Sequence, residues 1–492
     1  MRTLYKIFVI AAFGLAVGLT GTSSALAAPQ NSQKSIEKAF DAAKKKAWIE
    51  ATNHVNQAND PLAVKLIEWL RYQRADANVS FSTIADFIEA NPDWPRMSRL
   101  RRSAEAAISE NDDAATINAW FEKFPPLTGA GGLAHLDALV AVGELSKVRQ
   151  LVSPYWQTLN FKREDDKRFH RKYRTHLANA DQIIRLDRLI WDNQYSSATR
   201  MLSRVDAPQA ALGRARLALM RREAGVDGAI AKVPTALRDD LGLQYERLRW
   251  RRRKGKDQSA RELLFDAPVA TTNQEEWATE RLILARRALF QGHYSEARRM
   301  VATHGLTSGG KFAEAEFLAG WISLAFLDDP KTAYQHFTRL YDGVGYPISR
   351  ARGAYWAGRA ADAANDPQDA QRWWTVAAEF PATFYGQQAL AALGETSNPI
   401  PFFAPQPAPA AGESVEPELA QAVRLLHRYD QQSHIVPFLR KLTQLSTTLD
   451  ERFAIIDLAN DVDHPHEAVR TAKRVAQLDN VVPAPSYPLL PT

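Results

Sequence analysis

The sequence predicts an all-α protein built as a solenoid of stacked helical hairpins. Apolar residues recur at steps of three and four along most of the chain, as in Leu282, Leu289 and Phe290. Stretches with the alternating pattern of a β-strand are scarce. Helix-turn-helix units recur at a nearly fixed spacing, and 492 residues exceed what one compact core accommodates. These observations favour an extended array of repeats.

The first 27 residues are expected to direct export rather than to join the fold. Arg2 and Lys6 make a positive start, residues 7–19 are an apolar run, and Ala25-Leu26-Ala27 offers a cleavage position. A transmembrane anchor is the less favoured alternative, because the apolar run is short. The chain has no cysteine, which excludes disulfides, thiolate metal sites and a lipoprotein anchor. We therefore expect a periplasmic protein without a membrane anchor.

Residues 28–395 are predicted to form one helical domain, which is less regular up to about residue 181. Prolines interrupt this first part within residues 60–62, 91–96 and 124–129. Proline ends helices at such points because it lacks an N–H donor and restricts the residue before it.

Six later units place an alanine early in the second helix of each hairpin, at spacings of 31, 31, 37, 36 and 37 residues. The last two also have small residues in their first helix, Ala319-Gly320 and Ala357-Gly358, and Phe337 or Trp374 four positions after the alanine. We expect the small residues to allow close helix packing and the aromatic ring to fill the groove, as in TPR-like repeats. Because alanine is common here, a coincidental register is the alternative, and it is stronger for the first three units. The aligned alanines are Ala198, Ala229, Ala260, Ala297, Ala333 and Ala370.

Residues 396–416 are expected to form a semi-rigid linker, because five prolines fall between Pro399 and Pro409. A small helical linker domain is predicted over residues 417–482, and the tail, residues 483–492, is expected to lead towards a further domain that this chain lacks. The expected core of the small domain comprises Leu425, Leu426, Phe438, Leu439, Phe453 and Ile456.

Residues 346–390 carry a resemblance to a known family. The stretch opens with Tyr346-Pro347-Ile348-Ser349-Arg350-Ala351-Arg352, continues through Tyr355-Trp356 and Gly358-Arg359, and closes with Thr383-Phe384-Tyr385-Gly386-Gln387. It resembles the end of the superhelical region of the soluble lytic murein transglycosylases, periplasmic enzymes that cleave peptidoglycan. Residues 91–96, 100–102, 124–129 and 466–473 add support by their order along the chain.

The resemblance implies a superhelix of α-hairpins that curls into a ring or horseshoe and carries a docked lysozyme-like domain. In that domain one glutamic acid protonates the glycosidic oxygen between N-acetylmuramic acid and N-acetylglucosamine. It then acts as a base for attack by the muramic 6-hydroxyl, which gives a 1,6-anhydro sugar instead of the hydrolysed product of a two-carboxylate enzyme. Peptidoglycan is the implied partner, together with a separate or missing catalytic domain.

The sequence departs from the family where catalysis would be expected. No segment shows the Glu-Ser pairing on an apolar helix or the downstream Gly-Leu-Met-Gln type of motif. The only literal Glu-Ser pair, Glu413-Ser414, lies at the edge of the proline-rich linker, where no enclosing apolar pocket is expected. We therefore expect no catalytic residue in this chain and no cleavage by it alone.

Six residues are candidates for binding substrate or for docking the catalytic domain, because of their place in the family's pattern. The aromatic residues near them could stack on sugars, but burial is the favoured reading in helical repeats. The candidates are Arg350, Arg352, Tyr355, Arg359, Phe384 and Tyr385.

The sequence has two basic runs, one from Arg247 to Lys256 and one from Lys162 to Arg174. For both, a structural explanation is favoured over ligand binding. The first could hold an anionic glycan–peptide strand, but a solvated helix end is favoured. Self-pairing along a helix is favoured for the second. The histidines have no further ligands nearby in the sequence, so neither a metal nor a cofactor is expected.

The net charge of +6 suits anionic peptidoglycan or lipid, and export argues against nucleic acid. Two functions stay open from the sequence. One is the non-catalytic superhelical part of a soluble lytic transglycosylase. The other is a periplasmic helical-repeat scaffold that binds protein partners, because helical solenoids serve many functions.

Overall fold

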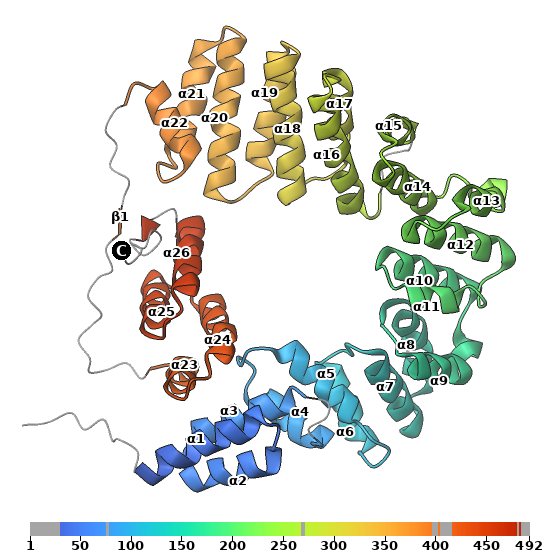
Figure 1. Ribbon diagram of the computed structural model, residues 1–492, viewed down its shortest axis with the longest axis vertical. Coiled ribbons are helices and arrows are strands. Elements are labelled where there is room, and N and C mark those ends of the chain that lie inside the picture. The colour runs from blue at the N-terminus through green and yellow to red at the C-terminus, as the bar shows by residue number, and fades with distance from the viewer. Residues whose placement is uncertain are drawn as a thin grey trace, which may run out of the picture. The chain divides into compact units, whose positions relative to one another are not determined.

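The computed structural model describes residues 30–74, 78–266, 271–395, 402–403, 416–479 and 482–483. The expected signal peptide, Glu413 and most of both proline-rich stretches lie outside these residues. The described part of the chain is almost entirely helical (Figure 1), which confirms the all-α prediction. Its only strands are β1 (Phe402–Phe403) and β2 (Val482–Pro483), which pair in parallel.

The chain divides into two compact units, residues 1–71 and residues 72–492. In the first unit α1 and α2 form a hairpin that buries Ile36, Phe40 and Val55. The helices of this unit are α1 (Gln30–Lys44), α2 (Trp48–Ala58) and α3 (Pro61–Tyr72), whose last residue belongs to the second unit.

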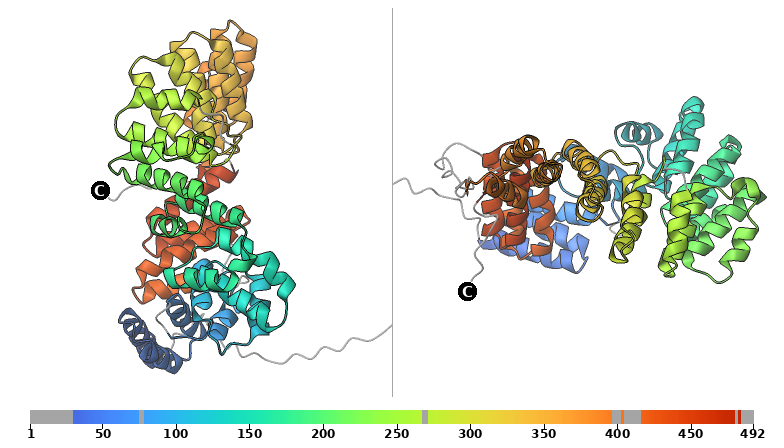
Figure 2. Two further views of the ribbon diagram at one scale, coloured as in Figure 1. Left: turned by 90° about the vertical axis from the view of Figure 1, so that its right-hand side faces the viewer. Right: turned by 90° about the horizontal axis from the view of Figure 1, so that it is seen from above.

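In the second unit most consecutive helices pack on one another as hairpins, and the views in Figures 1 and 2 agree that α16 to α22 lie side by side. The first helices are α4 (Phe81–Ala90), α5 (Met97–Ala107), α6 (Ala114–Lys123), α7 (Gly129–Ala141), α8 (Leu145–Thr158), α9 (Arg163–Tyr173), α10 (Asn179–Trp191), α11 (Tyr195–Met201), α12 (Ala207–Arg221), α13 (Val226–Ala231), α14 (Leu241–Arg253) and α15 (Asp257–Asp266). The next are α16 (Gln274–Phe290), α17 (Tyr294–Ala302), α18 (Gly310–Phe326), α19 (Pro330–Asp342), α20 (Pro347–Ala363), α21 (Pro367–Ala378) and α22 (Phe384–Ala392). The last are α23 (Glu418–Arg428), α24 (Gln432–Leu445), α25 (Leu449–Asp461) and α26 (Pro465–Asp479), and two 3-10 turns cover Arg174–His176 and Thr235–Leu237.

The aligned alanines lie at helix–helix contacts. Five of the six, all except Ala229, are completely buried. Ala229 is half-buried because its helix, α13, has only six residues and cannot cover a full hairpin face. The repeat register predicted from the sequence is therefore confirmed for five units and is weak in one.

Small residues and aromatic rings fit together in the last hairpins as the sequence predicted. A Cβ atom placed on Gly320 of α18 would lie 2.7 Å from Cε1 of Phe337 on α19. A Cβ atom on Gly358 of α20 would lie 2.5 Å from Cδ1 of Trp374 on α21. Each ring occupies the space that a side chain on the preceding helix would need, so the two helices approach closely.

The last four helices have their own core and contact the beginning of the same unit. All six predicted core residues of this module, from Leu425 to Ile456, are buried. The ring of Trp94, in the turn between α4 and α5, lies 5.4 Å from that of Phe438 on α24. Its Nε1 donates a hydrogen bond to Oε1 of Glu418 at 2.7 Å, and Lys441 Nζ lies 3.5 Å from Asp93 Oδ1. The Asn-Pro-Asp-Trp-Pro-Arg motif thus joins elements more than 300 residues apart.

Replacing Gly358 by alanine should lower the stability of the fold, because the new methyl group would collide with Trp374 and with the backbone oxygen of Ala370, 3.1 Å away. We expect a loss of about 1–3 kcal/mol, measured by the thermal unfolding midpoint. Gly228→Ala on α13 is the matched control. It would meet no atom within 4 Å and should stabilise the helix by about 0.5–1 kcal/mol. Equal shifts for both variants would contradict the packing argument.

Candidate functional site

The six site residues predicted from the sequence lie on α20 and at the start of α22. Pro347 opens α20, where the missing N–H of proline is harmless in the first turn. Thr383 caps α22, because its hydroxyl accepts a hydrogen bond from the backbone N–H of Gly386 at 3.0 Å. These local signals fix where the two helices begin and hence which side chains meet between them.

Five of the six residues come together, and we call them the aromatic–arginine cluster: Arg352, Tyr355, Arg359, Phe384 and Tyr385. The first three are spaced by three and four residues and therefore share one face of α20. The Tyr355 ring lies 5.7 Å from that of Tyr385, which lies 5.1 Å from that of Phe384. Nη1 of Arg359 donates a hydrogen bond to the Tyr355 hydroxyl at 3.2 Å.

Arg350 is separate from this cluster. It lies two residues before Arg352, which places it on another side of the helix. Its guanidinium hydrogen-bonds the Tyr341 hydroxyl and lies over the rings of Tyr341 and Phe380, at 4.5 and 5.8 Å. Arg350 therefore joins α20 to α19 and to the segment before α22.

Within the cluster, only part of the surface is accessible. Arg352 stacks over the ring of Phe317 at 4.7 Å and donates to the backbone oxygen of Ala313 at 3.4 Å. Burial lowers the pKa of Arg352, and Tyr385 and Glu314 partly oppose this effect. Tyr355 is buried, whereas Arg359 is exposed and Phe384 is 64% exposed. Arg359 and Phe384 are thus the most accessible members, whereas Arg352 and Tyr385 are half-buried.

The other aromatic residues of this region serve mainly as packing. Tyr355 and Trp373 are buried in one apolar core, and Trp356 and Trp374 pack against it. Nε1 of Trp373 donates to the Tyr334 hydroxyl at 3.0 Å. The sequence favours burial of these rings over stacking on sugars. This interpretation is confirmed for Tyr355 and Trp373, the two buried rings.

Several basic residues of the two runs pair with acidic residues, some on the same helix and some on a neighbouring helix. On α14, Arg252 pairs with Glu280 of α16, with Nη2 2.8 Å from Oε1, and Arg249 lies 3.7 Å from Glu246. On α9, Arg168 and Lys172 pair with Asp137 of α7, at 3.2 and 2.7 Å, and Lys167 lies 3.5 Å from Glu164 of its own helix. The expected self-pairing along a helix is therefore right for Lys167 and wrong for the other two, because Asp137 of the neighbouring helix lies closer to them.

Sequence reasoning missed a buried ionic cluster around Glu316 of α18. His304 Nε2 lies 3.1 Å from Glu316 Oε1, and His336 Nδ1 lies 2.6 Å from Oε2. The backbone N–H of Leu306 donates to His304 Nδ1 at 2.9 Å, so the proton of this ring is on Nε2 and faces the carboxylate. Burial raises the pKa of Glu316, but hydrogen bonds from both histidines and the charge of Arg339 outweigh burial and lower the pKa to about 2. No short sequence motif could announce this cluster, because its members come from three separate segments.

The pKa of Glu246, on α14, is shifted in the opposite direction to that of Glu316. Burial raises its pKa to about 7, against the attraction of Arg249 and Arg216. Such a pKa suits a general acid, but only 2% of the residue is exposed, so a substrate cannot reach it. Glu246 therefore affects stability rather than chemistry.

In the described ranges no cluster of three or more histidine, aspartate or glutamate side chains is arranged to hold a metal ion. Across the same ranges, every helix is too short or too polar to cross a membrane.

Comparisons with known proteins place this geometry in a known fold. No family model matches the sequence, and no curated protein matches it. Among solved structures, an inactive mutant of the lytic transglycosylase Slt from Pseudomonas aeruginosa is 14% identical, with a TM-score of 0.58 over 90% of this chain and 71% of that chain. The 70-kDa soluble lytic transglycosylase of Escherichia coli is 14% identical, with a TM-score of 0.55 over 89% and 70%.

The chain has the fold of the soluble lytic transglycosylases. A complex of the 70-kDa soluble lytic transglycosylase with bulgecin A agrees, at 15% identity and a TM-score of 0.56 over 90% of this chain and 69% of that chain. The resemblance read from residues 346–390 is confirmed at the level of the fold. At such identities the likeness concerns the course of the helices and assigns no role to single residues.

Replacing Glu316 by glutamine should destabilise the protein, because His304 and His336 would lose their buried charged partner. We expect a loss of about 2–4 kcal/mol at pH 7, measured by thermal unfolding. Because the folded pKa is below the usual value of 4.5, this contribution is present above pH 4.5 and should disappear as the pH falls towards 2. Glu314→Gln on the same helix is the control. Glu314 pairs with Arg286 in a half-exposed position, so it should cost less than about 1 kcal/mol. Similar losses for both variants would refute the special role of Glu316.

Replacing Glu246 by glutamine should raise stability at alkaline pH. The unfolded chain loses this proton near pH 4.5 and the folded chain near 7, so stability decreases as the pH rises through that window. We expect Glu246→Gln to gain about 1–3 kcal/mol at pH 8 and nothing at pH 4, measured by unfolding midpoints. Glu262→Gln on α15, at an exposed position, is the control and should change the unfolding midpoint little. A gain that is the same at both pH values would disprove the assignment.

Proposed function

We propose that this chain is the non-catalytic helical part of a soluble lytic murein transglycosylase. It holds peptidoglycan and positions a lysozyme-like domain that cleaves the bond between N-acetylmuramic acid and N-acetylglucosamine to 1,6-anhydro products. The observation that carries this proposal is the fold shared with the lytic transglycosylases over about 90% of the chain.

The proposal includes the organisation predicted from the sequence. Residues 1–27 direct export to the periplasm, residues 28–395 form the helical domain, and residues 396–416 form a linker. Residues 417–482 form the small helical domain, and the last ten residues lead from it. The net charge of +6, or +4 once Arg2 and Lys6 leave with the signal, supports attraction to the carboxylate-bearing peptidoglycan.

A non-catalytic role is supported by two buried carboxylates, because partners within the fold enclose both. Asp166 is enclosed by Arg185 and Arg204, at 3.5 and 2.5 Å. Glu105 accepts hydrogen bonds from the backbone of Leu127 and Thr128, at 2.7 and 2.9 Å. A general acid for glycosidic cleavage must reach the glycosidic oxygen. Both of these carboxylates are enclosed by partners within the fold.

The accessible part of the aromatic–arginine cluster is the proposed contact surface. Arg359 offers a charge to the anionic strand or to the docked domain, and Phe384 offers an apolar face. Tyr355 accepts the hydrogen bond from Arg359, and Tyr385 packs between Tyr355 and Phe384. Arg350 and Arg352 instead join α20 to α19 and α18.

A second candidate is a periplasmic scaffold that binds protein partners. It is favoured by the exposed apolar side chains of Tyr346 and Ile348 at the start of α20, which are 50% and 58% exposed. Exposed aromatic and aliphatic groups of this kind are typical of protein contact surfaces.

Sedimentation with purified sacculi separates the two candidates. The full chain should sediment with sacculi and release no anhydro-muropeptides. Arg359→Glu combined with Phe384→Ser should weaken sedimentation severalfold, because it removes the accessible charge and ring. Lys331→Glu with Phe290→Ser is the matched control, since it alters an exposed charge and a 90% exposed ring on α19 and α16.

Three results would contradict the proposal in different ways. A chain that stays in the supernatant favours the protein scaffold. Release of anhydro-muropeptides overturns the non-catalytic role. Equal weakening in both double variants removes the assignment of Arg359 and Phe384.

A further inference from the structure

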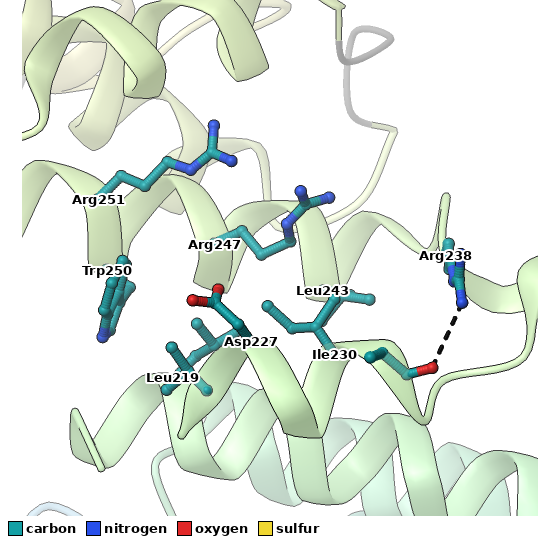
Figure 3. Close-up of a pocket in the computed structure, with 10 residues that line it drawn as sticks. Leu219, Asp227, Ile230, Arg238, Leu243, Arg247, Trp250 and Arg251 are labelled. Atoms are coloured by element: carbon teal, nitrogen blue, oxygen red, sulfur yellow. Dashed lines mark hydrogen bonds between the residues drawn. The ribbon is translucent and has the colours of Figure 1, made fainter. Parts of the chain in front are cut away.

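A pocket of about 330 Å³ lies between α12, α13 and α14 and shares no residue with the aromatic–arginine cluster (Figure 3). Its floor is apolar and belongs to a small core of its own, in which Leu219, Val226 and Leu243 are buried and Ile230 packs against them. Trp250 of α14 also lines the pocket. The floor offers space and an apolar surface for a small side chain.

The rim of the pocket is positively charged. Arg247 and Arg251 reach from α14, Arg238 lies at the end beyond α13, and Asp227 is the one acidic lining residue. Figure 3 shows the Asp227 carboxylate extending from α13 towards the side of Arg247. Three guanidinium groups against one carboxylate leave an excess of positive charge.

Arg247 and Arg251 differ from two neighbours on α14 in forming no close ion pair within the described residues. Arg249 and Arg252 lie close to Glu246 and Glu280, whereas in the described part of the chain no carboxylate lies within 4.0 Å of the rim arginines. Nη1 of Arg247 donates a hydrogen bond to the neutral Oε1 of Gln244, at 3.3 Å. Burial and the nearby charge of Arg251 lower the pKa of Arg247, and the more distant carboxylates of Asp227 and Asp239 only partly oppose this effect.

The other two rim arginines are held in place by backbone oxygens. Nη1 of Arg251 donates to the backbone oxygen of Ser259 at 2.8 Å, and Nε of Arg238 donates to that of Val233 at 3.1 Å. Such contacts orient a guanidinium but leave its charge for another molecule. The rim is therefore arranged before any ligand arrives.

We propose that this pocket binds a short peptide that carries a free carboxylate next to a small apolar side chain. A guanidinium binds a carboxylate through paired N–H donors, which suits Arg247 and Arg251. The apolar floor receives the side chain, and Asp227 accepts a hydrogen bond from an amino or amide group of the peptide. A bare phosphate would use the arginines but neither the floor nor Asp227.

The source of this peptide rests on the proposed function. The peptide stems of peptidoglycan carry free carboxylates beside alanine side chains, so they have the required chemistry. The pocket would then bind the peptide part of the strand, independently of the surface around Arg359.

Calorimetric titration of the full chain tests this assignment. The ligands are a soluble disaccharide-tetrapeptide, the same disaccharide without peptide, the tetrapeptide with its carboxylates amidated, and inorganic phosphate. The first should bind, and removing the peptide or amidating it should abolish most of the affinity. Arg247→Gln should weaken binding of the disaccharide-tetrapeptide by about tenfold or more. Lys254→Gln removes an equal charge just beyond the end of α14, outside the pocket, and should change binding less than about threefold.

The outcomes distinguish the pocket from the proposed function. Unchanged binding in Arg247→Gln, equal binding of the disaccharide without peptide, equal binding of phosphate, or no binding at all would each overturn the pocket assignment. Sedimentation with sacculi would still stand in those cases. Binding of the peptide by a chain that fails to sediment would support the pocket and refute the proposed function. Equal unfolding midpoints for the two variants ensure that a lost affinity is not a lost fold.

Discussion

The close approach of paired helices is the constraint on which the last hairpins depend. Gly320 and Gly358 leave the space that Phe337 and Trp374 fill from the next helix. One hairpin cannot cover such a ring alone, so each is stabilised by the neighbour that closes its apolar face. Stability in an array of this kind is local, and substitutions should act mainly on the hairpins that they touch.

The sequence predicted this packing because the signal is local and repeated. The alanine register and the small-residue positions can be read at spacings of one hairpin, and five of the six alanines are completely buried. Ala229 departs from the pattern because α13 is short. The buried ion clusters had no such signal. Glu316 meets His304 and His336 only after two helices and a loop have packed, and each residue in the sequence is unremarkable alone.

For some motifs the sequence indicates a family resemblance but not the structural role of the residues. Residues 124–129, which lead into α7, resemble a family motif in the sequence. In the structure, Glu105 of α5 accepts hydrogen bonds from the backbone N–H groups of Leu127 and Thr128 in this turn. A Cβ atom on Gly131 would lie 2.4 Å from Glu105 Oε2, so the glycine makes room for a buried carboxylate.

The basic run on α14 shows what helical geometry adds to a count of charges. Arg247 and Arg251 are four residues apart and share one face, whereas Arg249 and Arg252 approach acidic residues elsewhere. A fold shared at 14–15% identity requires that packing positions keep their volume, but it places no such demand on exposed charges. The binding partner of this chain must therefore be determined by side chains that do not take part in the packing of the helices. Arg359, Phe384 and the rim arginines are side chains of that kind, because Arg359 and Phe384 are exposed and, in the described residues, no carboxylate lies within 4.0 Å of the rim arginines.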